Sequence, residues 1–282
     1  MSRVAAAVVT HNGVPWVSEC LESILGQTRP ADVVVVLDDH STDGTVELLQ
    51  ERYATDITLM TADYTVQGLA THARIATNFT RAVQQAVALG ADLVALGDQD
   101  DRWLSDRLAL QVDAMQNFAM LASDGWLVNS SGLRNGSTLR DAFPVSADFE
   151  SWAPEAQLGY ALHHSVATGG ASMIRPSVFR SLQVPAGWLH DRWWSLAAIA
   201  LGRFSIERSC LIEYRLSADQ VVGLARGSQG GRLSTRIRQQ VGRGSALTKL
   251  RALRTLQTWP GVEPGVQRLL QWPNLIGATV RS

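Results

Sequence analysis

The stretch that decides the fold of this chain reads Leu93-Val94-Ala95-Leu96-Gly97-Asp98-Gln99-Asp100-Asp101. Its apolar start favours a short buried strand, which delivers carboxylates to its C-terminal edge. Ligands of open α/β sheets bind just outside the carboxyl ends of the strands. Crowded carboxylates repel one another unless a cation neutralises them, and oxygen ligands suit Mg²⁺ or Mn²⁺ that also binds substrate phosphates. The alternative is a solvated acidic turn that caps a helix from Trp103 onward, and this stretch alone leaves both interpretations open.

Strands and helices alternate on both sides of this stretch. The patterns predict strands at 4–9, 33–37, 57–60 and 93–96, and helices at 14–25, 45–53, 73–89 and 101–118. This rhythm indicates an α/β fold with a mostly parallel sheet flanked by helices. Residues 129–165 break into Gly, Ser, Pro and aromatic residues, which predicts a long irregular loop, and order resumes from Val166 to about Val222.

The composition excludes several classes of protein. The chain has 282 residues and a net charge of −1, so nothing in its overall charge suggests nucleic acid as a partner. Only Cys20 and Cys210 are present, which excludes a disulfide scaffold and a four-cysteine zinc site. The apolar run at 4–9 is too short for a signal peptide, and no apolar stretch approaches the roughly 20 residues that span a bilayer. We therefore expect a soluble, cytoplasmic protein.

A basic segment follows the ordered part. Eight basic residues and no acid lie between Arg226 and Arg254, and Lys249 is the only lysine of the chain. The spacing of its apolar residues predicts a helical region at 225–282, a small appendage beyond a main domain at 1–224. Its charge fits a solvated helical face, a dimer contact or peripheral contact with anionic lipid at the inner face of a membrane. The basic residues are Arg226, Arg232, Arg236, Arg238, Arg243, Lys249, Arg251 and Arg254.

A second acidic pair stands at the end of another predicted strand. Asp38 and Asp39 follow the run at 33–37, and the turn Ser41-Thr42-Asp43-Gly44 comes next. A carboxylate at this edge can accept hydrogen bonds from a nucleotide base or ribose, whereas Ser41 or Asp43 also makes a good helix N-cap. The glycine-rich dinucleotide fingerprint and the Walker lysine motif are both missing, which argues against those two classes of nucleotide site.

Six segments together carry a family resemblance. They are Val33–Thr45, Asn78-Phe79, Gly97–Trp103, Thr168–Met173, His190–Trp194 and Tyr214-Arg215. In this order and spacing, from residue 3 to about 222, the chain resembles family-2 glycosyltransferases of GT-A fold. The forms Asp98-Gln99-Asp100-Asp101 and His190-Asp191-Arg192-Trp193 resemble their bacterial rhamnosyltransferase-like branch. The resemblance implies a nucleotide-binding part at 1–128 and an acceptor part at 129–224.

The resemblance also implies roles for individual residues. Asp38 and Asp39 would contact the nucleotide, and Thr10 and Asn12 would line its pocket. The two acids of the family's DXD motif would be Asp98 and Asp100: Asp100 would bind Mg²⁺ or Mn²⁺, and Asp98 would contact the ribose or the metal. The general base would be Asp191. Gly169, Gly170, His190 and Trp194 would lie on the acceptor side.

The chain departs from the family pattern after Tyr214-Arg215. Relatives often carry a His two positions beyond this Arg, but here Leu216-Ser217 follows. If that His normally assists at the metal or the diphosphate, a substitute is needed, and Arg215 or a basic residue of the tail is the candidate.

The resemblance implies an inverting, metal-dependent glycosyltransferase. A nucleotide-linked sugar, dTDP-rhamnose in the favoured version and otherwise a UDP-linked sugar, would pass to a hydroxyl of a glycan, a lipid-linked glycan or a natural product in cell-envelope polysaccharide synthesis. One metal-side acid cluster and one separate base suit inversion, because retention would need a second carboxylate at the anomeric carbon. Two alternatives stay open: an inactive glycan-binding or scaffold module of the same fold, and a nucleotidyltransferase. The latter is expected to carry a phosphate loop after the first strand, whereas Thr10–Pro15 has no such composition.

Overall fold

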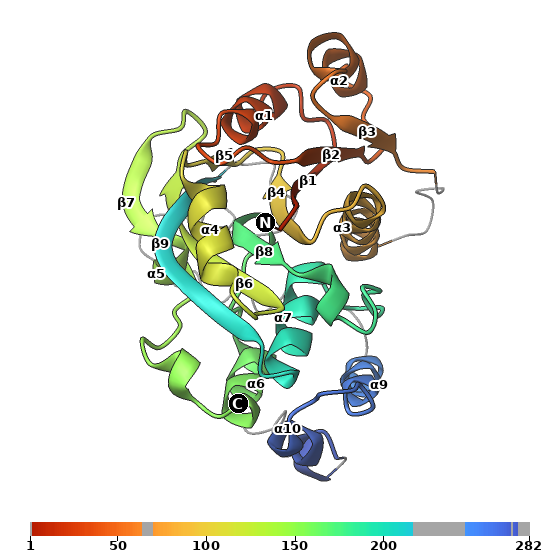
Figure 1. The fold of residues 1–282 in the computed structure, drawn as a ribbon, viewed down its shortest axis with the longest axis vertical. Coiled ribbons are helices and arrows are strands. Elements are labelled where there is room, and N and C mark those ends of the chain that lie inside the picture. Colours follow the sequence, from red (N-terminus) through yellow and green to blue (C-terminus); the bar gives the residue numbers. More distant parts are fainter. Residues whose placement is uncertain (1, 64–69, 217–245, 272, 276–282) are drawn as a thin grey trace.

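A nine-stranded sheet forms the centre of the protein, and helices cover it on both sides (Figure 1). The computed structural model describes residues 2–63, 70–216, 246–271 and 273–275. The strand order is β3-β2-β1-β4-β8-β6-β9-β5, with β7 beside β6. The first part of the chain follows the predicted alternation, with bounds β1 Val4–Thr10, α1 Val17–Leu25, β2 Val33–Asp38, α2 Thr45–Tyr53, β3 Thr58–Thr61, α3 Thr71–Ala88 and β4 Leu93–Asp98.

The four N-terminal strands run parallel, as predicted, and β1 lies between β2 and β4. Thr10 is opposite Asp38, and Val9 is opposite Asp98, so the carboxyl ends of the three strands meet at one edge. Alternate residues of β1 enter different cores. Val4, Ala6 and Val8 pack with α1 and α2, whereas Ala5 and Ala7 pack with α3. Burial on both faces explains why β1 is apolar throughout and not alternating.

The second part of the sheet is mixed. β8 pairs antiparallel with both β4 and β6, and β9 runs parallel to β6. The twelve-residue β9 therefore extends from the far end of the sheet to the edge where β4 ends. The elements of this part are α4 Arg107–Met115, β6 Met120–Val128, η2 Gly169–Ala171, β8 Ser172–Ile174, η3 Pro176–Val178, α7 His190–Ala200 and β9 Phe204–Arg215.

The helix expected at 101–118 begins later than predicted. Arg102 and Trp103 form the short strand β5, which pairs antiparallel with β9, and α4 starts only at Arg107. Trp103 is buried and packs against the acidic stretch, and Asp101 is 1% exposed. The solvated acidic turn is therefore excluded.

The prediction of a long irregular loop at 129–165 is wrong, because this segment folds into short helices and a strand. Thr138 caps the first helix with a reciprocal capping box to Asp141, and Pro154 occupies the first turn of the last. Phe149 and Leu158 anchor the segment in the core. Contacts of these anchors stabilise helices that carry little periodic signal of their own. The elements are β7 Arg134–Thr138, α5 Leu139–Ala142, η1 Phe149–Ser151 and α6 Pro154–His163.

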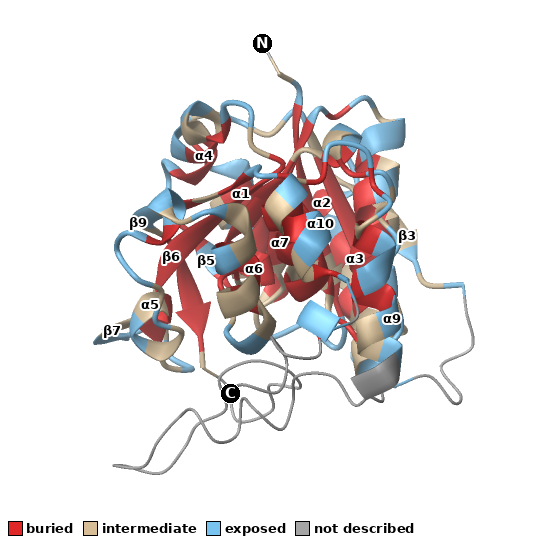
Figure 2. Cartoon of the chain, turned by 90° about the horizontal axis from the view of Figure 1, so that it is seen from below, coloured by how far each residue is buried: buried red, intermediate tan, exposed pale blue. Residues whose placement is uncertain are grey.

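The predicted C-terminal appendage contains the helices α9 (Ala246–Leu256) and α10 (Pro264–Leu269), which pack into the main core. Leu253, Leu256 and Trp259 belong to the same apolar cluster as Trp193. Figure 2 shows the buried residues concentrated in the sheet and on the helix faces that cover it. Most of the basic segment, from Arg226 to Arg243, lies outside the described residues. No helix in the described ranges has the length and apolarity to cross a membrane.

Candidate active site

The end of β2 carries two buried carboxylates that both accept hydrogen bonds within the chain, and one of them, Asp39, pairs with a cation. Asp38 is buried and accepts hydrogen bonds from the Ser41 N–H (2.9 Å) and the Ser41 hydroxyl (2.5 Å). Asp39 is also buried and receives two hydrogen bonds from the Arg74 guanidinium, at 2.9 and 3.2 Å, while His40 Nδ1 lies 3.0 Å from its other oxygen. The loop is thereby fixed, and Arg74 on α3 is a partner that the sequence did not suggest.

Gln99 fastens the end of β1 to the acidic stretch. Its Oε1 accepts hydrogen bonds from the Thr10 hydroxyl (2.5 Å) and the His11 N–H (2.7 Å), and its Nε2 donates to the His11 carbonyl. Asn12, which adopts a left-handed conformation at φ 50°, accepts a hydrogen bond from the Thr42 N–H. Thr10 and Asn12 thus stand at the edge where the sequence puts them, and both side chains join strand ends to one another.

The acids that follow β4 repel one another. Asp98 and Asp100 are half-buried and Asp101 is fully buried. Burial, then the charges of Asp100 and Asp191, raise the pKa of Asp98 to about 7. Burial also raises the pKa of Asp100, and it raises that of Asp101 strongly, with help from the other two acids. Among the described residues, one oxygen of Asp101 has no hydrogen-bond partner. The charges of Arg107 and Arg215 oppose the rise in these pKa values, but burial outweighs them.

A buried guanidinium lies beneath this cluster. Arg107 is fully buried, stacks 3.7 Å from the centre of the Trp103 ring, and donates to the carbonyls of Leu96 (2.8 Å) and Ser172 (3.4 Å). The charges of Asp101 and Asp98 favour its protonated form, although burial lowers the pKa of Arg107 to about 9. Sequence analysis missed this residue, because an Arg at the start of a helix normally indicates an exposed face.

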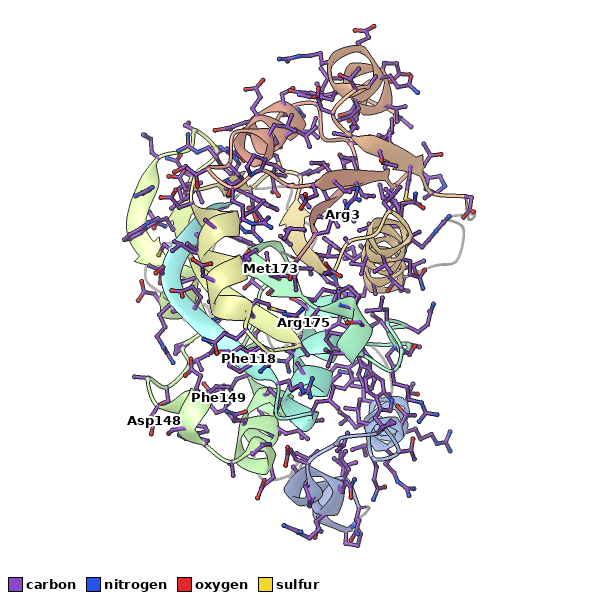
Figure 3. The ribbon with its side chains drawn as sticks, viewed as in Figure 1. Arg3, Phe118, Asp148, Phe149, Met173 and Arg175 are labelled. Atoms are coloured by element: carbon purple, nitrogen blue, oxygen red, sulfur yellow. The ribbon has the colours of Figure 1, made fainter. Side chains whose placement is uncertain are left out.

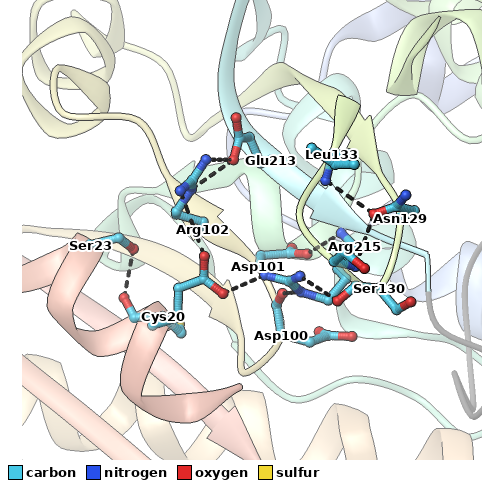
Figure 4. Close-up of polar contacts among 12 residues, drawn as sticks. Cys20, Ser23, Asp100, Asp101, Arg102, Asn129, Ser130, Leu133, Glu213 and Arg215 are labelled. Carbon is cyan, nitrogen blue, oxygen red and sulfur yellow. Dashed lines mark hydrogen bonds and ion pairs between the residues drawn. The ribbon is translucent and has the colours of Figure 1, made fainter. Parts of the chain in front are cut away.

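Arg215 supports the acidic stretch from the side of β9. Its backbone N–H donates to Asp101, and its guanidinium donates to the carbonyls of Asp100 (2.9 Å) and Ser130 (3.1 Å) (Figure 4). The same guanidinium pairs with Glu19 at 2.6 Å and stacks on Trp16. With 3% exposure, Arg215 is engaged in holding the acids in place. The geometry therefore favours a positioning role over the diphosphate contact that we expected.

Three neighbouring ion pairs extend this support. Glu213 is buried and binds Arg102 (Figure 4). Glu213 also binds Arg134, and Arg102 lies 3.7 Å from Glu19. The alternating charges connect α1, β5, β7 and β9 behind the acidic stretch. They restrict the stretch to one arrangement.

Gly169 and Gly170 bring the acids and Asp191 together. A Cβ atom on Gly170 would lie 2.7 Å from Asp101 Oδ2 and 2.8 Å from Asp98 Oδ2, and one on Gly169 would lie 2.5 Å from His190 Nε2. The Gly169 N–H donates to Asp191 Oδ2 at 3.3 Å, and the Arg192 N–H donates to Asp191 Oδ1 at 2.7 Å. Asp191 stands in the first turn of α7, where the helix dipole favours a carboxylate.

His190 and Trp194 lie behind this site. His190 stacks on Phe79 at 3.9 Å, and burial lowers its pKa to about 4. Neither of its ring nitrogens has a hydrogen-bond partner among the residues that the structure describes. Trp194 is completely buried and donates to the Leu182 carbonyl. The expected acceptor contacts of these two side chains do not match their burial, and we interpret both residues as packing that fixes Asp191.

The acid cluster fits a divalent cation on chemical grounds. It offers the carboxylate oxygens that such cations prefer. The raised pKa values of these acids show that their ionised forms are unfavourable without added positive charge, which a cation would supply. In the described part of the chain, no three His, Cys, Asp or Glu side chains form a complete set of metal ligands. A cation here would therefore take its remaining ligands from water or from a bound phosphate, as Mg²⁺ commonly does.

Comparisons with known proteins agree with this arrangement. The family model for "Glycosyl transferase family 2" matches residues 6–183. A dTDP-rhamnosyl transferase, RfbG of Shigella flexneri, is 27% identical over 111 residues, which cover 38% of this chain and 36% of that protein. A putative teichuronic acid biosynthesis glycosyltransferase, TuaG of Bacillus subtilis (strain 168), is 26% identical over 131 residues. These cover 43% of this chain and 49% of that protein. The matches thus span less than half of either relative.

Solved structures share the fold over almost the whole chain. A fragment of S. aureus TarS in complex with UDP-GlcNAc superposes with a TM-score of 0.59 at 17% identity, covering 97% of this chain and 71% of the fragment. The mannosyltransferase PcManGT from Pyrobaculum calidifontis, in complex with GDP-Man and Mn²⁺, gives a TM-score of 0.55 at 18% identity, covering 99% and 72%. The expected GT-A fold is confirmed.

Proposed function

Because this chain belongs to glycosyl transferase family 2, we propose that it transfers a sugar from a nucleotide donor to an acceptor hydroxyl with inversion. The observation that carries the proposal is the convergence of Asp98, Asp101 and Asp191 on Gly169-Gly170. A metal-side acid cluster and a separate, oriented carboxylate are the two groups that a single displacement requires. Their meeting at the edge where β1, β2 and β4 end leaves the donor and the acceptor adjacent.

The proposed roles follow from the contacts of each residue. Thr10, Asn12, Asp38 and Asp39 bind the nucleotide at the ends of β1 and β2. Asp98 and Asp100 hold a divalent cation, which supplies charge stabilisation for the departing diphosphate. This division makes residues 1–128 the donor half and residues 129–224 the acceptor half.

Asp191 is the proposed general base. It accepts the proton of the acceptor hydroxyl as that oxygen bonds to the anomeric carbon and the bond from this carbon to the diphosphate oxygen breaks. The Gly169 and Arg192 N–H groups each bind one oxygen of the carboxylate and fix its orientation. General-base assistance of this kind typically contributes about 10²–10⁴-fold to the rate.

The favoured donor is dTDP-rhamnose. Support comes from the form of the Asp98–Asp101 and His190–Trp193 segments and from the name of the Shigella relative. A UDP-linked sugar is the second candidate, because the TarS structure contains UDP-GlcNAc. A glycan or lipid-linked glycan is the proposed acceptor, at a membrane surface that the basic segment contacts. Vesicle flotation tests that contact, and equal partition to neutral and anionic lipid would contradict it.

The test is calorimetric titration with dTDP, UDP and GDP and their sugar conjugates, in Mg²⁺ or Mn²⁺ and again in chelator. We expect metal-dependent binding of one nucleotide, lost in Asp100→Ala. Binding of no nucleotide under either condition would contradict the donor site.

A second variant separates an enzyme from an inactive glycan-binding module. Asp191→Asn is expected to keep donor binding and lose turnover. If the unaltered protein shows no transfer and no donor hydrolysis although it binds nucleotide, the binding-module alternative is correct.

A further inference from the structure

A chain of aromatic rings runs from the core to the surface along α6. Phe204 and Phe149 are buried, and their ring centres lie 6.2 Å apart. From Phe149 the series continues to Trp152 at 5.4 Å, from Trp152 to Tyr160 at 5.7 Å, and from Tyr160 to His164 at 4.1 Å. Trp152 and Tyr160 are half-buried and His164 is exposed. We call Trp152, Tyr160 and His164 the α6 aromatic surface.

The rings of this surface are fixed in place. Tyr160 donates its hydroxyl to the Pro144 carbonyl at 2.6 Å, and His164 Nδ1 lies 3.1 Å from the Tyr160 carbonyl. The two rings stack almost in parallel, at 13°. Gln157, one turn before, donates to the Phe149 carbonyl and ties α6 to the buried end of the series. Partly exposed aromatic rings in a fixed arrangement lose little conformational entropy when a ligand packs on them.

One end of the surface adjoins the proposed base. Arg192 donates through its guanidinium to the His164 carbonyl and, at 3.4 Å, to the Leu162 carbonyl. Its backbone N–H donates to Asp191. One residue thus connects the C-terminal end of α6 to the carboxylate that is proposed to activate the acceptor.

Planar polar side chains flank the other end. Asp148 accepts a hydrogen bond from the Trp152 side chain, and Glu150 pairs with Arg208 at 2.7 Å. Asp148 and Phe149 lie in the segment between α5 and α6 (Figure 3). In the same neighbourhood Arg140 Nε is buried without a hydrogen-bond partner. Carboxylates and guanidinium groups bind adjacent hydroxyls in pairs, and aromatic rings pack on the C–H face of a sugar ring.

We propose that the α6 aromatic surface binds a saccharide acceptor of at least two sugar units. The sugar that receives the transferred group lies at the His164 end, next to Asp191, and the preceding sugar packs on Tyr160 and Trp152. The proposal rests on the transferase function proposed above, because that function makes Asp191 the group beside which an acceptor hydroxyl must lie. It assigns acceptor recognition to residues 148–164, which the chain folds around the buried ring of Phe149.

The test uses an immobilised panel of oligosaccharides of one to six units that contain rhamnose, glucose, galactose or N-acetylglucosamine. The full chain is applied unaltered and as Trp152→Ala, His164→Ala and Tyr160→Phe. His163→Ala is the matched control, since His163 is exposed beside His164 but forms none of the ring contacts above. Calorimetric nucleotide titration and the midpoint of thermal unfolding are measured for every variant.

We expect binding of one saccharide class, stronger for two or more units than for one. Trp152→Ala and His164→Ala should each weaken it by about three- to ten-fold, the range for loss of one aromatic contact. Tyr160→Phe keeps the ring and should retain binding, as should His163→Ala. Nucleotide affinity should be unchanged in all four variants.

Two results would overturn the proposal. The first is nucleotide binding without binding of any saccharide on the panel, which leaves the donor site intact and removes the acceptor surface. The second is saccharide binding that Trp152→Ala and His164→Ala reduce no more than His163→Ala does. Failure of nucleotide binding, by contrast, would contradict the transferase function, whatever the panel shows.

Discussion

The two acidic strand ends of this protein look alike in sequence and differ in their charge balance. At the end of β2, Asp38 is bound by Ser41, and Asp39 by Arg74. The cations nearest the end of β4 are Arg107 and Arg215, and both donate hydrogen bonds mainly to backbone carbonyls. Within the described residues, one oxygen of Asp101 has no hydrogen-bond partner. One end is complete within the chain. The other keeps carboxylates that repel one another, which the proposed cation would neutralise.

This difference separates positioning from binding. Carboxylates that a protein pairs internally stabilise its structure, whereas carboxylates crowded together cost stability until something binds to them. The β2 end is therefore a preformed wall. The β4 end is the part whose occupation changes the energy of the protein.

The largest expected effect is on turnover, when one acid at each of the two strand ends is substituted in turn. Asp100→Asn should reduce turnover about a thousand-fold, because a metal at this position contributes several kcal/mol of charge stabilisation. Its free energy of unfolding in chelator should stay equal or rise, since one repelling charge is removed. Asp39→Asn should instead lower the unfolding free energy, because Arg74 loses its carboxylate partner, and the weakened nucleotide binding that remains should still require the metal. Urea unfolding with nucleotide calorimetry measures both, and equal losses of stability in the two variants would break the comparison.

The next effect concerns the buried cation beneath the β4 end. Arg107→Met removes a fully buried guanidinium whose charge favours the ionised forms of Asp98 and Asp101. The unfolding free energy should fall by about 3 kcal/mol, as when one partner of a buried charge group is removed. Adding Asp98→Asn should restore part of the loss in a double-mutant cycle. Additive losses would show that Arg107 acts through packing on Trp103 alone.

A smaller loss is expected at the β2 end. Arg74→Met leaves Asp39 without its two guanidinium hydrogen bonds, which should cost about 1–3 kcal/mol of unfolding free energy. Arg81→Met on the same helix is the matched control, because Arg81 is half-buried and its partner Asp63 is exposed. Its effect should stay within about 1 kcal/mol. Similar losses in both variants would contradict the internal pairing of Asp39.

The smallest expected effect is the change in unfolding free energy per unit of pH, measured on the metal-free protein. The pKa of Asp98 is raised in the fold from 3.8 to about 7, so the folded state binds more protons than the unfolded state between these values. Stability in chelator should therefore fall as the pH rises from about 4 to 7, by at most about 1.4 kcal/mol per unit, and level off above. His190, with a pKa of about 4, has the opposite slope over this range. The difference between the unaltered protein and Asp98→Asn isolates the acid, and a difference that does not vary with pH would contradict the prediction.

The sequence allowed the parallel half of the fold to be predicted, because β1, β2 and β4 are apolar runs that end in polar residues at one edge. It also indicated Asp98, Asp100 and Asp191 through the order of short motifs. Strand β5 could not be predicted, since the partner of Arg102 lies 111 residues later in the chain. Arg107 was missed because a buried charge follows from tertiary neighbours and leaves no periodic signal. The segment 129–165 was misjudged for a related reason, as Phe149 organises elements too short to show a period.

The paired glycines at 169 and 170 also bear on how the protein could be redesigned. A side chain at Gly169 would collide with His190, and one at Gly170 with two carboxylates, whereas a Cβ at Gly159 on α6 meets nothing within 4 Å. A randomised library would thus return glycine alone at the first two positions and a broad choice at the third. Redesign of the proposed acceptor surface should therefore keep Gly169 and Gly170 and begin at Gly159, where an added side chain has open space.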